Sequence, residues 1–167
     1  MSSDLYLLDD QLRPFAEYLL RVAGDAGLAP RVTSTRRSSA EQERLYRRYL
    51  SGQAQFPAAP PGASAHEYGW AFDMVVEPFD ALTDVGRFWR ELGGEWGARS
   101  DPVHFQLPGA TQAAKNALKQ AILDNQALSD TPWIFRRGVI PHWLESAFRL
   151  IPGVSPVSYV LDQLGLH

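Results

Sequence analysis

The chain has 167 residues, 45% of them hydrophobic, and a formal net charge of −3. That length and apolar content suit a compact globular protein, and the slightly negative charge gives no general attraction to nucleic acid, so we expect no nucleic-acid partner. The sequence contains no cysteine, which excludes disulfides and thiolate metal sites, so a metal ion could be bound only through histidine and carboxylate groups.

The N-terminal segment does not have the form of a secretory signal. Residues 1–10 lack a basic start and an apolar core, and no stretch approaches the ~18 uninterrupted apolar residues of a transmembrane helix. We therefore expect a protein that is synthesised in the cytoplasm without a signal peptide and has no transmembrane segment.

Two helices and a strand are predicted in the first 50 residues. Leu12, Phe15 and Leu19 recur near helical spacing, which predicts a helix from Gln11 to Gly27. A strand is predicted over residues 31–35.

The second helix is predicted to begin near Ser39, with Leu45 and Tyr49 as its apolar stripe. Residues 52–65 are rich in proline, alanine and glycine, which predicts an irregular loop in front of the next strand.

Two short segments are predicted to be strands that carry polar side chains on one face. In residues 70–76, Asp73 shares a face with two apolar side chains, and in residues 103–107, His104 and Gln106 share a face. Burying an unpaired carboxylate costs several kcal/mol or more, so Asp73 requires a cation, a hydrogen-bond network or a metal.

The histidines beside these carboxylates favour the metal. A catalytic zinc takes three protein ligands and leaves one position for water, and His66, Asp73 and His104 could supply such a set. Asp101 precedes His104 by three residues and could face the same cavity as a general base. Each residue alone more often has a structural role, but their joint arrangement favours a metal site.

These residues match a known pattern. The element Ser-x-His-x-x-Gly-x-Ala-x-Asp is present as Ser64, His66, Gly69, Ala71 and Asp73, and an acid-x-x-His element as Asp101 and His104. In these residues the sequence resembles the zinc peptidases that include VanY-type D-alanyl-D-alanine carboxypeptidases, VanX-type dipeptidases and phage L-alanyl-D-glutamate endopeptidases. Residues 33–38 are similar to the family's Thr-Ser-x-Tyr-Arg-Ser segment, with Arg37 at the functional arginine and Arg36 in place of the tyrosine.

The resemblance implies an α+β fold, with a small antiparallel sheet flanked by helices. It also implies Zn²⁺ bound by His66, Asp73 and His104, with Asp101 as general base. By its motif position, Arg37 would stabilise an oxyanion or hold a substrate carboxylate. Ser64 would orient a ligand or bind substrate, although a serine in a turn before a strand needs no function.

The resemblance spans roughly residues 10 to 108, so we divide the chain into a catalytic domain over 1–109 and a helical C-terminal extension over 110–167. Further helices are predicted over residues 84–92, 111–128 and 143–150, with an aromatic and basic run at 133–137. Three roles compete for the extension: packing on the catalytic domain, which we favour, self-association, or attachment to the wall or a membrane surface.

The expected substrate is the stem peptide of peptidoglycan. Many relatives have Glu-x-Trp-His where this chain has an aspartate, Asp101, which resembles the phage endopeptidase branch and favours cleavage between L-Ala and D-Glu. The alternatives are a D-Ala-D-Ala carboxypeptidase, and a wall-binding or virion structural module without turnover. A wall enzyme without a signal peptide suggests delivery to the cell wall or periplasm by a phage.

Overall fold

The computed structural model describes residues 3–54 and 56–126; the predicted helix over 143–150 and the aromatic run over 133–137 lie outside the described residues. The described chain forms two compact units. The first comprises residues up to 38 together with 65–110, and the second comprises residues 39–64 together with 111–126. Whether 110–167 forms an extension packed on a catalytic domain therefore stays a prediction.

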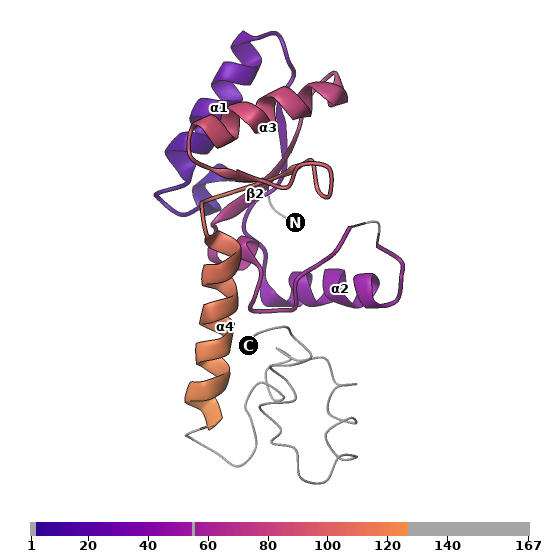
Figure 1. The fold of residues 1–167 in the computed structure, drawn as a ribbon, viewed down its shortest axis with the longest axis vertical. Helices are drawn as coiled ribbons and strands as arrows, with labels where there is room; N and C mark the ends of the chain where they lie inside the picture. The colour runs from indigo at the N-terminus through magenta and orange to yellow at the C-terminus, as the bar shows by residue number, and fades with distance from the viewer. Residues whose placement is uncertain (1–2, 55, 127–167) are drawn as a thin grey trace. The chain divides into compact units, whose positions relative to one another are not determined.

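The first unit is built on an antiparallel sheet. In chain order it contains η1 (Leu5–Leu7), α1 (Arg13–Asp25), β1 (Arg31–Ser34), η2 (Ala65–Tyr68), β2 (Ala71–Val75), η3 (Phe79–Ala81), α3 (Leu82–Glu91), β3 (Glu95–Trp96) and β4 (His104–Gln106). The strands pair in the order β1-β2-β4-β3, and every pairing is antiparallel (Figure 1). The predicted α+β class with a small antiparallel sheet is confirmed.

The two faces of the sheet differ in polarity. Helices α1 and α3 lie on one side of it, and apolar side chains from both helices and from β2 and β4 form the core there (Figure 1). Phe72 stacks on Phe105 with ring centroids 5.4 Å apart, and the edge of Trp89 meets Phe72 at 5.6 Å. Burial of each such side chain stabilises the fold by roughly 1.5–3 kcal/mol. Because side chains alternate along a strand, Asp73 and His104 point to the opposite face.

The predicted helix over 11–27 is present as α1, which is two residues shorter at each end. Its C-terminal end is closed by Gly27, which has φ +80° and donates its backbone N–H to the Gly24 carbonyl. The predicted helix over 84–92 is present as α3, Leu82–Glu91.

The second unit contains α2 (Ser39–Leu50), the loop that follows it, and all but the first residue of α4 (Ala110–Gln126). The predicted apolar stripe of α2 is wrong at Tyr49, which is 41% exposed, because the buried side of the helix carries Gln42 and Tyr46. The side-chain amide of Gln42 donates to the Ala59 carbonyl of the loop, at 2.7 Å, which offsets part of the cost of burying this polar side chain.

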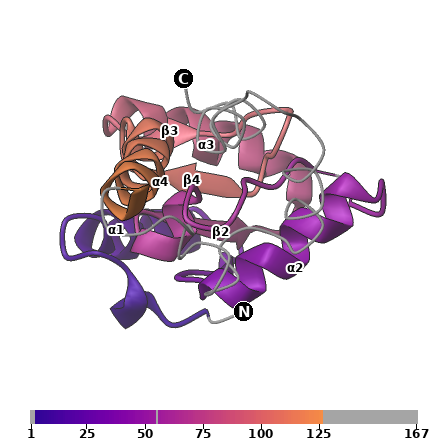
Figure 2. The same cartoon turned by 90° about the horizontal axis from the view of Figure 1, so that it is seen from below.

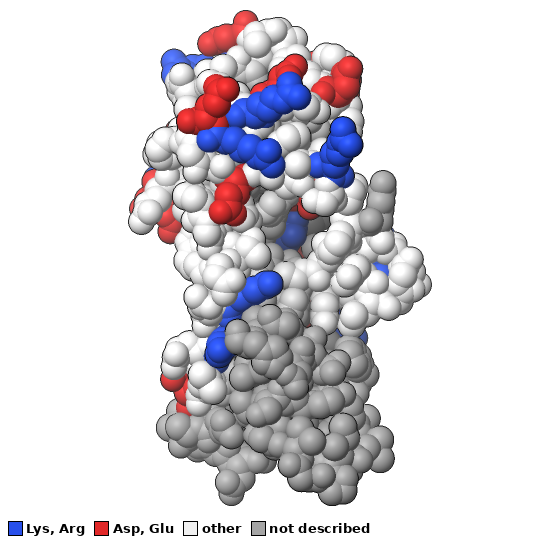
Figure 3. Space-filling model, in the orientation of Figure 1, with Lys and Arg blue, Asp and Glu red and all other residues white. Residues whose placement is uncertain are grey.

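The surface of the first unit mixes charges of both signs. Basic and acidic side chains are interspersed over α1 and α3 in the view of Figure 3, and exposed pairs such as Arg87 with Asp84, at 3.2 Å, neutralise one another. This face therefore offers no extended positive field of the kind that nucleic-acid binding needs. Among the described helices, none has the length and apolar character required to cross a membrane.

Candidate metal centre

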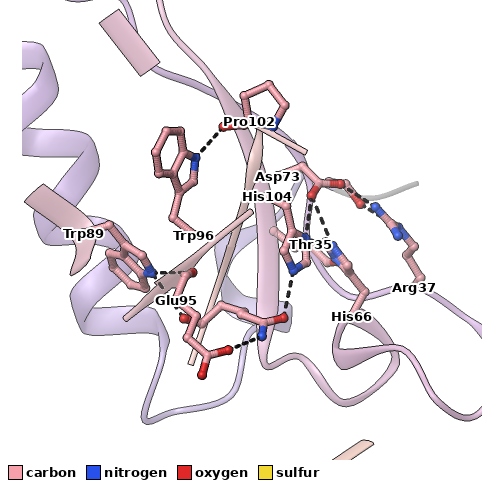
Figure 4. Close-up of polar contacts among 11 residues, drawn as sticks. Thr35, Arg37, His66, Asp73, Trp89, Glu95, Trp96, Pro102 and His104 are labelled. Carbon is pink, nitrogen blue, oxygen red and sulfur yellow. Dashed lines mark hydrogen bonds and ion pairs between the residues drawn. The ribbon is translucent and has the colours of Figure 1, made fainter. Parts of the chain in front are cut away.

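Three side chains able to bind a metal converge on the polar face of the sheet. His66 comes from η2, Asp73 from β2 and His104 from β4 (Figure 4). Nε2 of His66, Nδ1 of His104 and Oδ1 of Asp73 are each 3.2 Å from the other two atoms. The three donor atoms therefore form a nearly equilateral triangle.

This triangle fits a four-coordinate metal ion. Zinc bonds of about 2.0–2.2 Å in tetrahedral geometry place ligand atoms about 3.3–3.6 Å apart, close to the observed 3.2 Å. Two imidazoles and one carboxylate are also a common donor set for catalytic zinc. The residues present therefore fit the ion in both spacing and chemistry.

Strand register brings Asp73 and His104 together. β2 is the strand between β1 and β4, and β2 and β4 are seen next to each other in Figure 2. Asp73 pairs directly with His104 across the β2–β4 ladder. On the other side, a bulge between Val32 and Ser34 shifts β1 so that Ser34 pairs with Asp73. Bulges of this kind redirect a strand, and here the chain that leaves β1 supplies Thr35 and Arg37 to the site.

The short turn η2 fixes His66. The Arg37 backbone N–H donates to the His66 carbonyl at 3.1 Å, and the Trp70 N–H donates to the Ala65 carbonyl at 3.0 Å. Gly69 closes the turn with φ +76°, and a Cβ there would lie 2.9 Å from the Leu7 carbonyl oxygen. This position therefore requires glycine, which gives a physical reason for the glycine in the motif.

Hydrogen bonds on the far side of each imidazole select the nitrogen that faces the centre. His66 Nδ1 lies 2.8 Å from the Thr35 carbonyl, which can only accept, so Nδ1 carries the hydrogen and Nε2 presents its lone pair. His104 Nε2 lies 2.9 Å from Oε1 of Gln106, which leaves Nδ1 on the side of Asp73. Such partners orient imidazole ligands in metal sites.

The cost of burying the Asp73 carboxylate can be offset by a cation, a hydrogen-bond network or a metal, and two of these three are present. The Arg37 guanidinium donates to Oδ2 of Asp73, and both histidines lie beside Oδ1. The same guanidinium donates through Nε to the Ser34 hydroxyl, at 3.1 Å. A cation and a hydrogen-bond network are therefore both present, and the third compensation, the metal, fits the same donors.

The environment shifts the pKa values of the group in different directions. Burial lowers the pKa of His66 and so favours its neutral, metal-binding form. For Asp73, burial acts to raise the pKa, but the interactions with His104 and His66 outweigh it and hold the pKa well below its ordinary range. For His104, burial acts to lower the pKa, but the hydrogen bond with Asp73 prevails and raises it.

Asp101 lies in the turn before β4 and interacts electrostatically with the three candidate ligands and with Arg37. Its backbone accepts from the His104 N–H at 3.1 Å and donates to the Gly97 carbonyl at 3.3 Å. The Trp96 indole N–H donates to the Pro102 carbonyl at 2.7 Å, so Trp96 holds this turn. Burial raises the pKa of the Asp101 carboxyl.

Two further residues come from the segments that carry the sequence pattern. Arg36 is exposed and donates through Nε to the Glu67 carbonyl, at 3.2 Å. Ser64 is buried and falls at the end of a segment of the second unit, so its role toward substrate stays a prediction.

Sequence reasoning missed the residues that support the ligands. Thr35 contributes a carbonyl group, which no side-chain pattern shows. The sequence places Gln106 on the same strand face as His104, and a polar residue two positions from a candidate ligand is the available signal. Glu95, whose carboxylate accepts a hydrogen bond from the Gln106 amide at 2.6 Å, has no signal in the sequence, because it is brought to Gln106 by the pairing of β3 with β4.

Comparison with known proteins gives the family. Residues 6–101, more than half of the chain, match the family described as VanY: D-alanyl-D-alanine carboxypeptidase. The chain belongs to this family. It is thus a member of a family of peptidases that act on peptidoglycan. The matched segment includes Arg37, His66, Asp73 and Asp101 and ends just before His104. No curated protein sequence matches the chain.

Three solved structures are similar to the chain at sequence identities between 20% and 26%. The structure of VanYB in complex with D-alanine-D-alanine is 20% identical in sequence and has a TM-score of 0.46. The match covers 74% of this chain and 84% of the VanYB chain. A mutant of the vancomycin resistance D,D-pentapeptidase VanY from a VanB-type cassette, solved with Zn(II), is 20% identical with coverages of 65% and 76% and a TM-score of 0.45. The Serratia marcescens L-Ala D-Glu endopeptidase ChiX is 26% identical with coverages of 63% and 84% and a TM-score of 0.44.

Proposed function

We propose that the protein is a zinc-dependent peptidase that cuts the stem peptide of peptidoglycan, with His66, Asp73 and His104 as the zinc ligands. The observation that carries the proposal is the triangle of donor atoms with sides of 3.2 Å. Its two imidazole nitrogens are oriented by hydrogen bonds from behind, as ligands of a metal need to be. Membership of the VanY family supports the substrate class.

The chain's own residues account for the proton transfers. When bound, zinc supplies Lewis acidity that lowers the pKa of water to about 7 and polarises a carbonyl group. The Asp101 carboxylate accepts the proton of the attacking water and returns it to the leaving amine. Its raised pKa makes it a better proton acceptor than an ordinary aspartate once it is ionised.

We assign Arg37 two tasks. Its contact with Oδ2 of Asp73 orients that carboxylate so that Oδ1 faces the histidines. From the same place it stabilises negative charge that develops on the substrate or holds a substrate carboxylate. Ser64 would contact the substrate or orient a ligand.

For the bond cleaved, we propose the one between L-Ala and D-Glu, because the base is an aspartate, as in the phage endopeptidase branch that the sequence resembles. The second candidate is a D-Ala-D-Ala carboxypeptidase, which the description of the matching family favours. A phage origin would deliver the enzyme to the cell wall as an endolysin. For residues 110–167 we favour packing on the catalytic domain, and contact with the wall, with a membrane surface or with a second copy of the chain are the alternatives.

The test is mass spectrometry of purified peptidoglycan digested by the zinc-loaded protein, with His66→Ala and Asp101→Ala as controls. Stem peptides with new D-Glu amino termini, absent from both controls, are expected for the endopeptidase. Release of free D-Ala would instead identify the carboxypeptidase. If the folded, zinc-bound wild type cleaves nothing, a wall-binding or structural module without turnover replaces both proposals.

A further inference from the structure

The hydrogen bond between His104 and Gln106 is the first in a series that continues to Glu95, which the mechanism above does not use. His104 Nε2 lies 2.9 Å from Oε1 of Gln106, and the Gln106 amide group donates to Oε2 of Glu95 at 2.6 Å. The other carboxylate oxygen of Glu95 accepts the backbone N–H of Gly109 at 2.8 Å. Figure 4 shows this series running from Glu95 on β3 to His104 on β4.

The carboxylate of Glu95 determines the direction of every hydrogen bond between Glu95 and His104. A carboxylate can only accept hydrogen bonds, so Glu95 must face the NH₂ group of the Gln106 amide. The carbonyl oxygen of that amide then faces His104 and can only accept. Nε2 of His104 must therefore carry a hydrogen, which leaves the lone pair of the neutral ring on Nδ1, the atom that faces Asp73 and His66.

Strand pairing and the Trp89 side chain hold Glu95 and Gln106 in place. Glu95 and Gln106 are paired residues of the β3–β4 ladder. The indole N–H of the buried Trp89 lies 3.0 Å from the Glu95 carbonyl and 3.2 Å from the Gln106 carbonyl. Gln106 is only 6% exposed, whereas Glu95 is exposed and keeps its charge in contact with solvent. The charge of Glu95 therefore costs little desolvation. Glu95 acts on His104 only through the buried side-chain amide of Gln106.

We propose that Glu95, acting through Gln106, is a positioning residue that sets the tautomer and orientation of His104. The inference rests on the proposed function in that His104 is taken to be a zinc ligand. Outer partners of this kind change metal affinity by about 10- to 100-fold when they are removed. Glu95→Gln removes the fixed direction, because an amide at this position can donate as well as accept.

Two measurements test the proposal, with Glu91→Gln as the matched control, since Glu91 is an exposed glutamate at the end of α3 and its substitution changes the charge equally. Competition with a chromophoric chelator measures zinc affinity. We expect it to be about 10-fold weaker in Glu95→Gln and unchanged in the control. Long-range ¹H–¹⁵N NMR of the metal-free protein, above the pH at which its histidines titrate, measures the tautomer. We expect only the Nε2–H form of His104 in the wild type and a mixture in Glu95→Gln.

A rescue variant separates positioning from a general loss of structure. Combining Glu95→Gln with Gln106→Glu places the carboxylate directly against His104 Nε2 and should restore the single Nε2–H form. An unchanged tautomer and zinc affinity in Glu95→Gln, or equal weakening in Glu91→Gln, would overturn the inference. If the wild type itself does not bind zinc, the proposed function fails, whereas the tautomer measurement on metal-free protein still decides the role of Glu95.

Discussion

At the scale of single residues, the two histidines of the centre show how environment divides one residue type into two chemical states. Burial lowers the pKa of His66, whereas contact with Asp73 raises the pKa of His104. In the metal-free protein, the contact with Asp73 therefore favours the protonated form of His104. A zinc ion that takes up the same donors must displace that proton, so metal binding releases a proton to solvent.

A substitution at Asp101 tests the catalytic role of this residue separately from metal binding. Asp101→Asn keeps the shape of the side chain but removes the basic oxygen, and general-base catalysis contributes about 10²- to 10⁴-fold to rate. We expect kcat to fall by that factor with full zinc content, measured by turnover of a defined muropeptide and by metal analysis. Loss of zinc from this variant would instead make Asp101 part of the metal site.

The pH dependence of the reaction should report the same carboxyl group. Asp101 must be ionised to act as a base, and burial raises its pKa. Activity should therefore decline on acidification at a pH above the titration range of an exposed aspartate, and Asp101→Asn should lack this limb in its residual activity. A profile of kcat/KM against pH measures it, and an acid limb retained by Asp101→Asn would contradict the assignment.

At the scale of elements, the sequence predicted the features that depend on local patterns. The alternation around Asp73 and His104 predicted β2 and β4 and the side of the strand on which each side chain lies. The site also depends on contacts between distant segments, such as the bulge that places Ser34 opposite Asp73 and the pairing of Glu95 with Gln106. These contacts follow from the way in which strands pair across the sheet, which no local pattern specifies.

Tight packing between α3 and β3 provides a test at this scale. A Cβ on Gly86 of α3 would lie 2.1 Å from the Trp96 ring, whereas a Cβ on Gly24 of α1 would meet nothing within 4 Å. Gly86→Ala should destabilise the fold by about 1–3 kcal/mol through overpacking, and Gly24→Ala should stabilise it by up to about 1 kcal/mol because alanine favours helix.

Chemical denaturation of the metal-free proteins measures both changes. Because Trp96 also holds the turn that carries Asp101, Gly86→Ala should lower kcat as well. Equal stability of the two alanine variants would show that α3 and β3 can separate without cost.

At the scale of the whole molecule, the proposed ligands join segments that are far apart in the chain. His66 belongs to η2, Asp73 to β2 and His104 to β4, so an ion bound by all three adds a link across the first unit. An unfolded chain does not hold these donors together, and the free energy of zinc binding at the proposed site would therefore add to the stability of the fold.

Thermal unfolding with and without a chelator measures this contribution. Free zinc at 100 times its dissociation constant should stabilise the folded protein by about 2.7 kcal/mol, and addition of EDTA should reverse the shift in Tm. His66→Ala serves as the control, since it lacks one donor and should not respond to either reagent at the same concentration. A wild-type Tm that is indifferent to zinc and EDTA would argue against the site.

The direct pairing of Asp73 with His104 also bears on how the chain folds. A slip of two residues between β2 and β4 would keep the alternation of faces but would place Gln106 opposite Asp73, and an amide would replace the imidazole at that position. A misregistered sheet would thus lose one of its three donors. Under the proposed function, zinc would bind the correctly registered chain selectively and, when present during folding, would favour the correct alignment of the strands.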